Sequence, residues 1–109
     1  MTYEENFNKL KKILMKADVK KIDGELAFQF NIEGDGQGVF YVEVKDGQIN
    51  IEPYEYYDRD AMFIATAKVF TKLAEGKLNP VLAFSTGKLK VEGNLDKALE
   101  MQKITFANK

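Results

Sequence analysis

Apolar residues near the N-terminus recur every three or four positions, which is the spacing of one face of an α-helix. Thr2 and Glu5 have the spacing of a capping box, in which each side chain accepts a hydrogen bond from an otherwise unpaired backbone N–H. The sequence therefore predicts a first helix with one buried face. Its apolar stripe consists of Tyr3, Phe7, Leu10, Leu14 and Ala17.

The period shortens to two over the next part of the chain, which predicts β-strands. Residues 25–33, 39–45 and 48–52 alternate apolar and polar side chains, and Asp46-Gly47 is a strong signal for a two-residue hairpin turn. We expect a three-stranded antiparallel meander with one apolar face and one face polar enough to meet water. The expected inner residues are Leu26, Phe28, Phe30, Ile32, Phe40, Val42, Val44, Ile49 and Ile51.

Residues 61–65 form a short apolar run, and helical spacing returns after it. Thr66 can cap a helix that extends to residue 75, with Val69, Phe70 and Leu73 as its inward stripe. The sequence therefore predicts a fourth strand followed directly by a second helix.

Residues 76–94 are divided by turn signals into a short helix and a short strand. Gly76 can adopt the left-handed conformation that ends a helix, and Asn79-Pro80 can open the next helix with proline at its first position. Residues 88–92 then alternate as a strand does, and Asn94 can cap a last helix. The apolar positions of that helix and of the tail are Leu95, Ala98, Leu99, Met101, Ile104 and Phe106. We expect this tail to dock on the domain or to cover an opening.

The composition excludes several classes of site. The chain has 109 residues, which is enough for one domain with one core, and it contains neither histidine nor cysteine. Ser-His-Asp and Cys-His catalysis, disulfides and zinc sites with histidine or thiolate ligands are therefore impossible, and we expect no cofactor. A net charge of −1 argues against nucleic acid as a partner, because phosphate binding requires a cationic face. The chain lacks an apolar run of about 18 residues and a secretory signal, so we expect a cytoplasmic protein.

Three polar segments each allow two interpretations. Residues 1–21 carry six lysines against three acidic residues, and these lysines are either a solvated helix face or a surface that touches an anionic membrane. The glycine-rich residues 34–38 lack the spacing of a dinucleotide-binding loop, so we expect a hairpin turn there. The loop at residues 53–60 is rich in tyrosine and acids, which either fill an ordinary connection or perform acid–base chemistry. The candidates for that chemistry are Tyr56 or Tyr57 with Asp58 or Asp60.

The run GKLNPVLAFSTGKLKVEGN at residues 76–94 resembles the sterol carrier protein type 2 domain of intracellular lipid carriers. The matching features are G-K-L-x-P, then A-F, then G-K-L-K-x-x-G followed by Asp or Asn. Weaker similarity extends back to the hairpin at Asp46-Gly47 and so covers most of the chain, but residues 54–60 are not part of the pattern. The resemblance implies an α+β fold, with a five-stranded mixed, mostly antiparallel sheet and helices packed on one face.

The same resemblance implies a non-enzymatic carrier with an apolar cavity between sheet and helices, able to hold a fatty acid, acyl-CoA, sterol or phospholipid. Transferred to this chain, the cavity walls would be Phe28, Phe30, Phe40, Val42, Val69, Phe70, Leu73, Leu82 and Phe84, with Leu99, Met101, Ile104 and Phe106 near the mouth. These residues could equally fill an ordinary core. A tunnel of about 400 Å³ left empty would cost roughly 10 kcal/mol, so an unliganded form should be partly collapsed, wet or loaded with lipid.

Two other functions remain open. The chain could be an accessory or dimerisation domain with a filled core, whose apolar tail or exposed sheet edge meets a partner protein; we expect a monomer or a weak homodimer. It could also be a small isomerase or hydrolase that uses the tyrosine-rich loop. That last hypothesis predicts that the loop tyrosines line the cavity.

Overall fold

The computed structural model describes residues 1–20, 22 and 24–105, with only the backbone of Thr105. The first half contains α1 (Tyr3–Leu14), β1 (Leu26–Glu33), β2 (Gly38–Lys45) and β3 (Gln48–Glu52). The second half contains β4 (Ala61–Thr66), α2 (Ala67–Ala74), α3 (Pro80–Ser85), β5 (Lys90–Gly93), α4 (Leu95–Ala98) and α5 (Met101–Thr105). Phe106, one of the residues suggested for the cavity mouth, lies outside the described residues.

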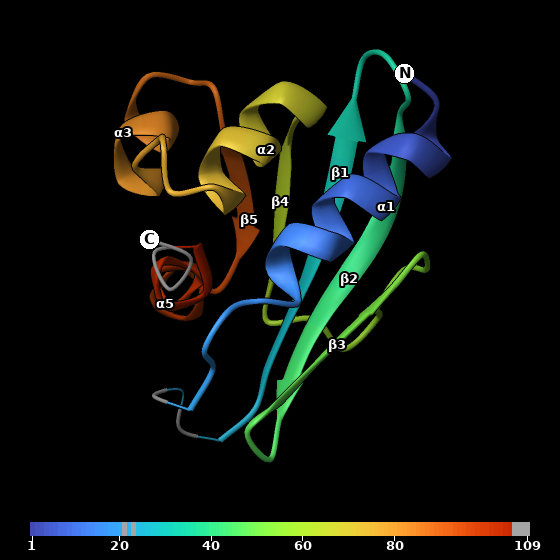
Figure 1. The fold of residues 1–109 in the computed structure, drawn as a ribbon. Coiled ribbons are helices and arrows are strands. Elements are labelled where there is room, and N and C mark those ends of the chain that lie inside the picture. Colours follow the sequence, from blue (N-terminus) through green and yellow to red (C-terminus); the bar gives the residue numbers. More distant parts are fainter. Residues whose placement is uncertain (21, 23, 106–109) are drawn as a thin grey trace.

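The strands form one sheet in the order β3-β2-β1-β4-β5. β1 and β4 are parallel, whereas the other three pairs are antiparallel, so the mixed and mostly antiparallel sheet expected from the sequence is confirmed. Figure 1 shows α1 and α2 across one face of this sheet and α3 and α5 beside β5. The helices therefore divide into a pair that covers the sheet centre and a group that lies at one edge.

The N-terminus of α1 is capped as predicted, but the helix is shorter than the predicted apolar stripe. Glu5 N donates to Thr2 Oγ1 at 3.2 Å and Thr2 N donates to Glu5 Oε1 at 3.0 Å, which confirms the capping box. Hydrogen bonds from the backbone and side chain of Thr2 lower the pKa of the Glu5 carboxyl. The helix ends at Leu14, so Ala17 of the predicted stripe lies in the connection that follows.

The sheet centre is filled by aromatic rings. Phe30 of β1 lies opposite Phe40 of β2 and Phe63 of β4 in the strand register, and their ring centroids are 5.0 and 5.2 Å away. Phe70 of α2 meets Phe30 edge-on at 5.3 Å, and Phe28 meets Phe63 at 5.1 Å. These contacts fix rigid rings beneath α1 and α2.

The second face of the sheet is less open to water than the alternation predicts. Gln29 and Ala27 of β1 point to this face, yet Gln29 is only 4% exposed and Ala27 is also buried. Residues 54–60 cover them, with Tyr56 N donating to Gln29 Oε1 at 3.1 Å and Ala27 N donating to Asp60 Oδ2 at 2.9 Å. The prediction of a solvated second face is therefore wrong at the centre of the sheet.

The C-terminal elements also differ from the pattern. β5 begins at Lys90 and not at residue 88, because the backbone N–H groups of Lys88 and Leu89 both donate to Ala83 O at the end of α3. The predicted last helix is two short helices, and hydrogen bonds of the i to i−3 type lie at their junction: Glu100 N donates to Lys97 O, and Gln102 N donates to Leu99 O.

Candidate functional site

An apolar cavity of about 300 Å³ lies between the β4–β5 edge of the sheet and helices α3, α4 and α5. Of the residues that line it, Gln102 alone has a polar side chain. The lining consists of Phe63, Pro80, Val81, Phe84, Leu89, Val91, Leu95, Ala98, Leu99, Met101 and Gln102.

Short elements aim these side chains inward. Asn79 caps α3 by accepting from Val81 N at 2.8 Å, and Val81 and Phe84 then lie three residues apart on one face of the helix. Val91 of β5 lies opposite Phe63 of β4 in the strand register, so both belong to the same face of the sheet. α4 and the residues after it close the remaining side.

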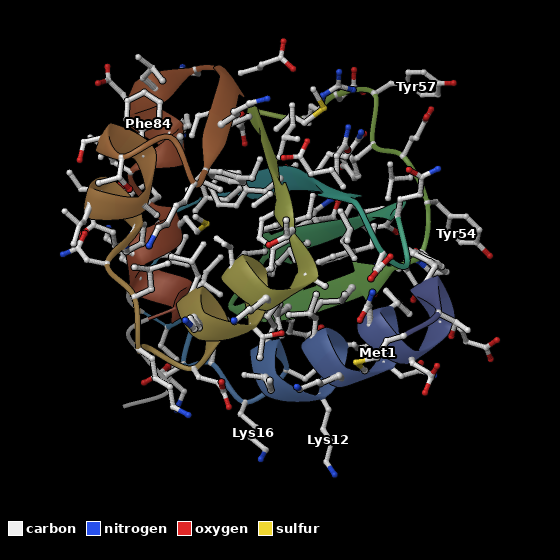
Figure 2. All side chains as sticks on the ribbon, turned by 90° about the horizontal axis from the view of Figure 1, so that it is seen from above. Met1, Lys12, Lys16, Tyr54, Tyr57 and Phe84 are labelled. Carbon is white, nitrogen blue, oxygen red and sulfur yellow. The ribbon has the colours of Figure 1, made fainter. Side chains whose placement is uncertain are left out.

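The cavity is buried at its base and open at its mouth. Phe63, Leu89 and Met101 are almost fully buried. The mouth is formed by side chains that are about half exposed, among them Val81 at 49%. Figure 2 shows Phe84 on α3, far from Tyr54 and Tyr57. The four half-exposed lining residues are Val81, Phe84, Leu95 and Leu99.

The structure places only part of the suggested site around this cavity. Phe84, Leu99 and Met101 line it. A second void of about 10 Å³, too small for a ligand, lies under α1 and α2. It is lined by Leu10, Leu14, Phe30, Phe40, Phe70, Leu73, Ala74, Met101 and Ile104.

The other suggested residues line neither space. Phe28 and Val42 are buried in the core, and Val69 is half-buried against it. Leu82 of α3 is 56% exposed and does not line the cavity, although its neighbour Val81 does. The walls expected from the sheet centre and α2 therefore do not border the cavity of about 300 Å³, because the phenylalanine rings at the sheet centre pack against one another.

Several lining residues were missed by sequence reasoning. A local signal existed for some of them: Val81 precedes Phe84 by one helical turn, and Leu89 and Val91 are the apolar positions of the predicted strand. No local pattern distinguishes Phe63 from Phe30, since both face inward and only one meets the cavity. The missed residues are Phe63, Pro80, Val81, Leu89, Val91, Leu95, Ala98 and Gln102.

The tyrosines of residues 54–60 lie on the opposite face of the sheet. Tyr56 Oη donates to Glu43 Oε2 at 2.6 Å, and this bond together with desolvation raises the pKa of Tyr56 to about 12. Tyr57 is 86% exposed beside a surface groove that also contains Arg59 and Glu92. Neither tyrosine lines the apolar cavity, contrary to the expectation of the isomerase or hydrolase hypothesis.

Acidic side chains nowhere gather in groups of three that could hold a metal ion within residues 1–20, 22 and 24–105. In the same part of the chain, every helix is too short or too polar to cross a bilayer.

Comparison with known proteins gives a family and a fold. The model of the SCP-2 sterol transfer family matches residues 6–105. Similar proteins include the Bos taurus hydroxysteroid dehydrogenase-like protein 2, 32% identical over 102 residues, and the Homo sapiens sterol carrier protein 2, 35% identical over 88 residues. These matches cover 93% and 79% of this chain but 24% and 16% of the two relatives, so the chain spans a quarter of their length or less.

A solution structure of Aedes aegypti sterol carrier protein 2 in complex with palmitate has the same fold, with a TM-score of 0.66. The two chains are 17% identical, and the match covers 100% of this chain and 98% of that one.

Proposed function

Because the chain belongs to the SCP-2 sterol transfer family, we propose that it binds the alkyl tail of a lipid in the apolar cavity and carries that lipid without chemical change. The observation that carries this proposal is the lining itself. Ten apolar residues and one amide surround about 300 Å³ of space that opens to solvent. This volume is at the lower end of the range of about 300–1,000 Å³ that is usual for ligand pockets.

The size of the cavity sets the length of tail that it can bury. At about 30 Å³ for each water-sized group, the cavity of about 300 Å³ takes roughly ten carbons. Burying each CH₂ contributes about 0.8 kcal/mol, so ten contribute about 8 kcal/mol before any ordering cost. That energy corresponds to a dissociation constant no tighter than about 1 μM, which suits a carrier that must release its ligand.

The head group of the lipid remains at the mouth. The lining has no charged side chain, and a carboxylate or phosphate buried there would lose its hydration without gaining a partner. The proposal is therefore that the cavity recognises the tail. A fatty acid, an acyl-CoA and a phospholipid with the same tail would bury the same surface, and the palmitate held by the Aedes aegypti relative makes that fatty acid the first probe.

A matched pair of variants on α3 tests the proposal. Val81 and Leu82 are neighbours and both about half exposed, but only Val81 lines the cavity. We expect Val81→Asp to weaken binding of a fluorescent fatty acid about tenfold or more, because its carboxylate adjoins the bound tail, whereas Leu82→Asp stays within about twofold. The measurements are fluorescence titration with palmitate as competitor, and native mass spectrometry for lipid that copurifies.

The proposal is overturned if the wild-type protein contains no copurified lipid and does not bind the fluorescent fatty acid saturably. Equal loss of affinity in both variants would place the ligand elsewhere on the surface.

The accessory role is the second candidate, since the relatives are four or more times longer than the matched segment and one is dehydrogenase-like. Deleting residues 104–109 is a poor test, because Ile104 is buried in the core. Light scattering of Leu82→Asp is a sharper test of the accessory role, because Leu82 is an exposed apolar residue that does not line the cavity. A dimer that dissociates in this variant while lipid binding is unchanged would favour the accessory role. The cytoplasmic location and the membrane contact of the basic N-terminal helix stay predictions. Figure 2 shows Lys12 of α1, and Lys16 just after it, pointing away from the protein.

A further inference from the structure

The cavity and the small inner void share one lining residue, Met101. Its side chain is 1% exposed, and it is the first residue of α5. Beyond it, on the inner side, lie residues of α1, α2 and the sheet centre. Met101 thus stands at the boundary between the space that is open to solvent and the space that is closed.

Aromatic rings complete this boundary. Phe63 lines the cavity and Phe30 lines the inner void, and their ring centroids are 5.2 Å apart. The two spaces are therefore neighbours, separated by the thickness of a few side chains. Together the Met101 side chain and the Phe30–Phe63 pair form a partition.

The two parts of the partition differ in the stiffness of their side chains. Phe30 is held by ring contacts to Phe40, Phe63 and Phe70, with centroids 5.0 to 5.3 Å away. Met101 has an unbranched side chain with three rotatable bonds, which can follow the shape of what it touches.

We propose that Met101 is a movable stop at the inner end of the cavity and that it sets the tail length this chain prefers. This inference rests on the proposed function. Tails short enough to end against Met101 bind without disturbing it, whereas a longer tail must either displace its side chain toward the inner void or leave its remaining carbons outside the mouth. Because that void holds only about 10 Å³, the displacement is resisted.

The stop has a measurable signature in a series of saturated fatty acids. Each CH₂ that enters the cavity should strengthen binding about fourfold, so affinity rises with length until the tail meets the stop. The breakpoint in wild-type protein is expected near ten buried carbons. Met101→Ala removes three heavy atoms from the partition, so its breakpoint should shift by about three carbons, and its affinity for long tails should rise by up to about fiftyfold.

Leu10→Ala is the matched control. Leu10 is also buried and lines the inner void, but it does not line the cavity. Its truncation enlarges the space into which Met101 can be displaced but leaves the partition in place, so its breakpoint should shift by fewer carbons than that of Met101→Ala. Displacement of a fluorescent fatty acid by acids of about 8 to about 18 carbons, kept below micelle formation, gives the three profiles. Thermal melts verify folding, and Met101→Val replaces the alanine variant if that variant does not fold.

An unchanged breakpoint in the Met101 variant overturns the inference, as does a shift in Leu10→Ala that is as large as the shift in Met101→Ala. Both results leave the proposed function intact, because the wild type still binds lipid. If the wild type shows no saturable binding, both the proposed function and the inference about Met101 are overturned.

Discussion

Filling the cavity should stabilise the unliganded protein and weaken lipid binding, two effects of opposite sign from one substitution. Ala98 is the residue for this test. It is the last residue of α4, it is almost buried, and its methyl group faces the cavity among larger apolar side chains. Replacing it with phenylalanine places a ring in space that lipid would otherwise occupy.

The magnitude follows from the surface that the ring would bury. Full burial of a phenylalanine side chain contributes about 1.5–3 kcal/mol, and its lower helix propensity costs about 0.5 kcal/mol. The free energy of unfolding of lipid-free Ala98→Phe should therefore rise by about 1–2.5 kcal/mol. For a domain of this size, that is a rise in melting temperature of roughly 4–15 °C. The ring also removes room for several tail carbons, so fatty acid affinity should fall by about tenfold or more.

Ala83→Phe is the control, because Ala83 is fully buried in α3 and is not a lining residue. The added ring has no space there, and overpacking should lower stability by about 1–3 kcal/mol or more. Urea unfolding of delipidated protein measures both variants, and fluorescence titration measures binding. Destabilisation of Ala98→Phe to the same degree as Ala83→Phe would mean that the cavity is already filled, and the reasoning about a lipid site would fail.

Two further predictions concern the polar face and the sheet edge. Gly93→Ala should lower stability by about 1–3 kcal/mol in urea unfolding, because φ is +101° there and a Cβ would lie 2.8 Å from Asp60 O; a neutral change would contradict this geometry. The raised pKa of Tyr56 means that its protonated hydroxyl, bonded to Glu43, contributes stability that is fully present below pH 10 and is lost as pH rises through about 12. Tyr56→Phe should therefore flatten the loss of stability above pH 10 and leave fatty acid affinity unchanged; a large loss of affinity would return the tyrosines to the candidate site.

The elements of this fold were predictable because their signals are local. Thr2, Asn79 and Asn94 each cap a helix through side-chain oxygens bonded to backbone N–H groups within three residues along the chain. The strand alternation likewise needs no knowledge of distant residues. The mixed, mostly antiparallel character of the sheet came from the family resemblance and not from the alternation itself, since the parallel pairing of β1 with β4 joins segments about thirty residues apart.

The candidate site was less predictable because an inward direction does not say what a side chain meets. Phe30 and Phe63 are equivalent in pattern, but Phe30 is surrounded by rings and Phe63 borders the cavity. Gln29 is buried only because a loop more than twenty residues away folds over it. These outcomes depend on which elements pack together, so they are properties of the tertiary structure.

The open mouth lowers the free-energy cost of keeping a cavity of this size. A sealed, dry void of about 300 Å³ would cost about 7 kcal/mol at about 24 cal/mol per Å³, which is comparable with the whole stability of a small domain. The half-exposed residues at the mouth instead admit water or an alkyl tail, so that cost is not incurred in full. β5 has four residues and α3 has six, and such short elements bring few large side chains across the gap. The β5 edge of the sheet, where these short elements leave the cavity open, is thus the place where the proposed lipid tail would enter without unfolding the core.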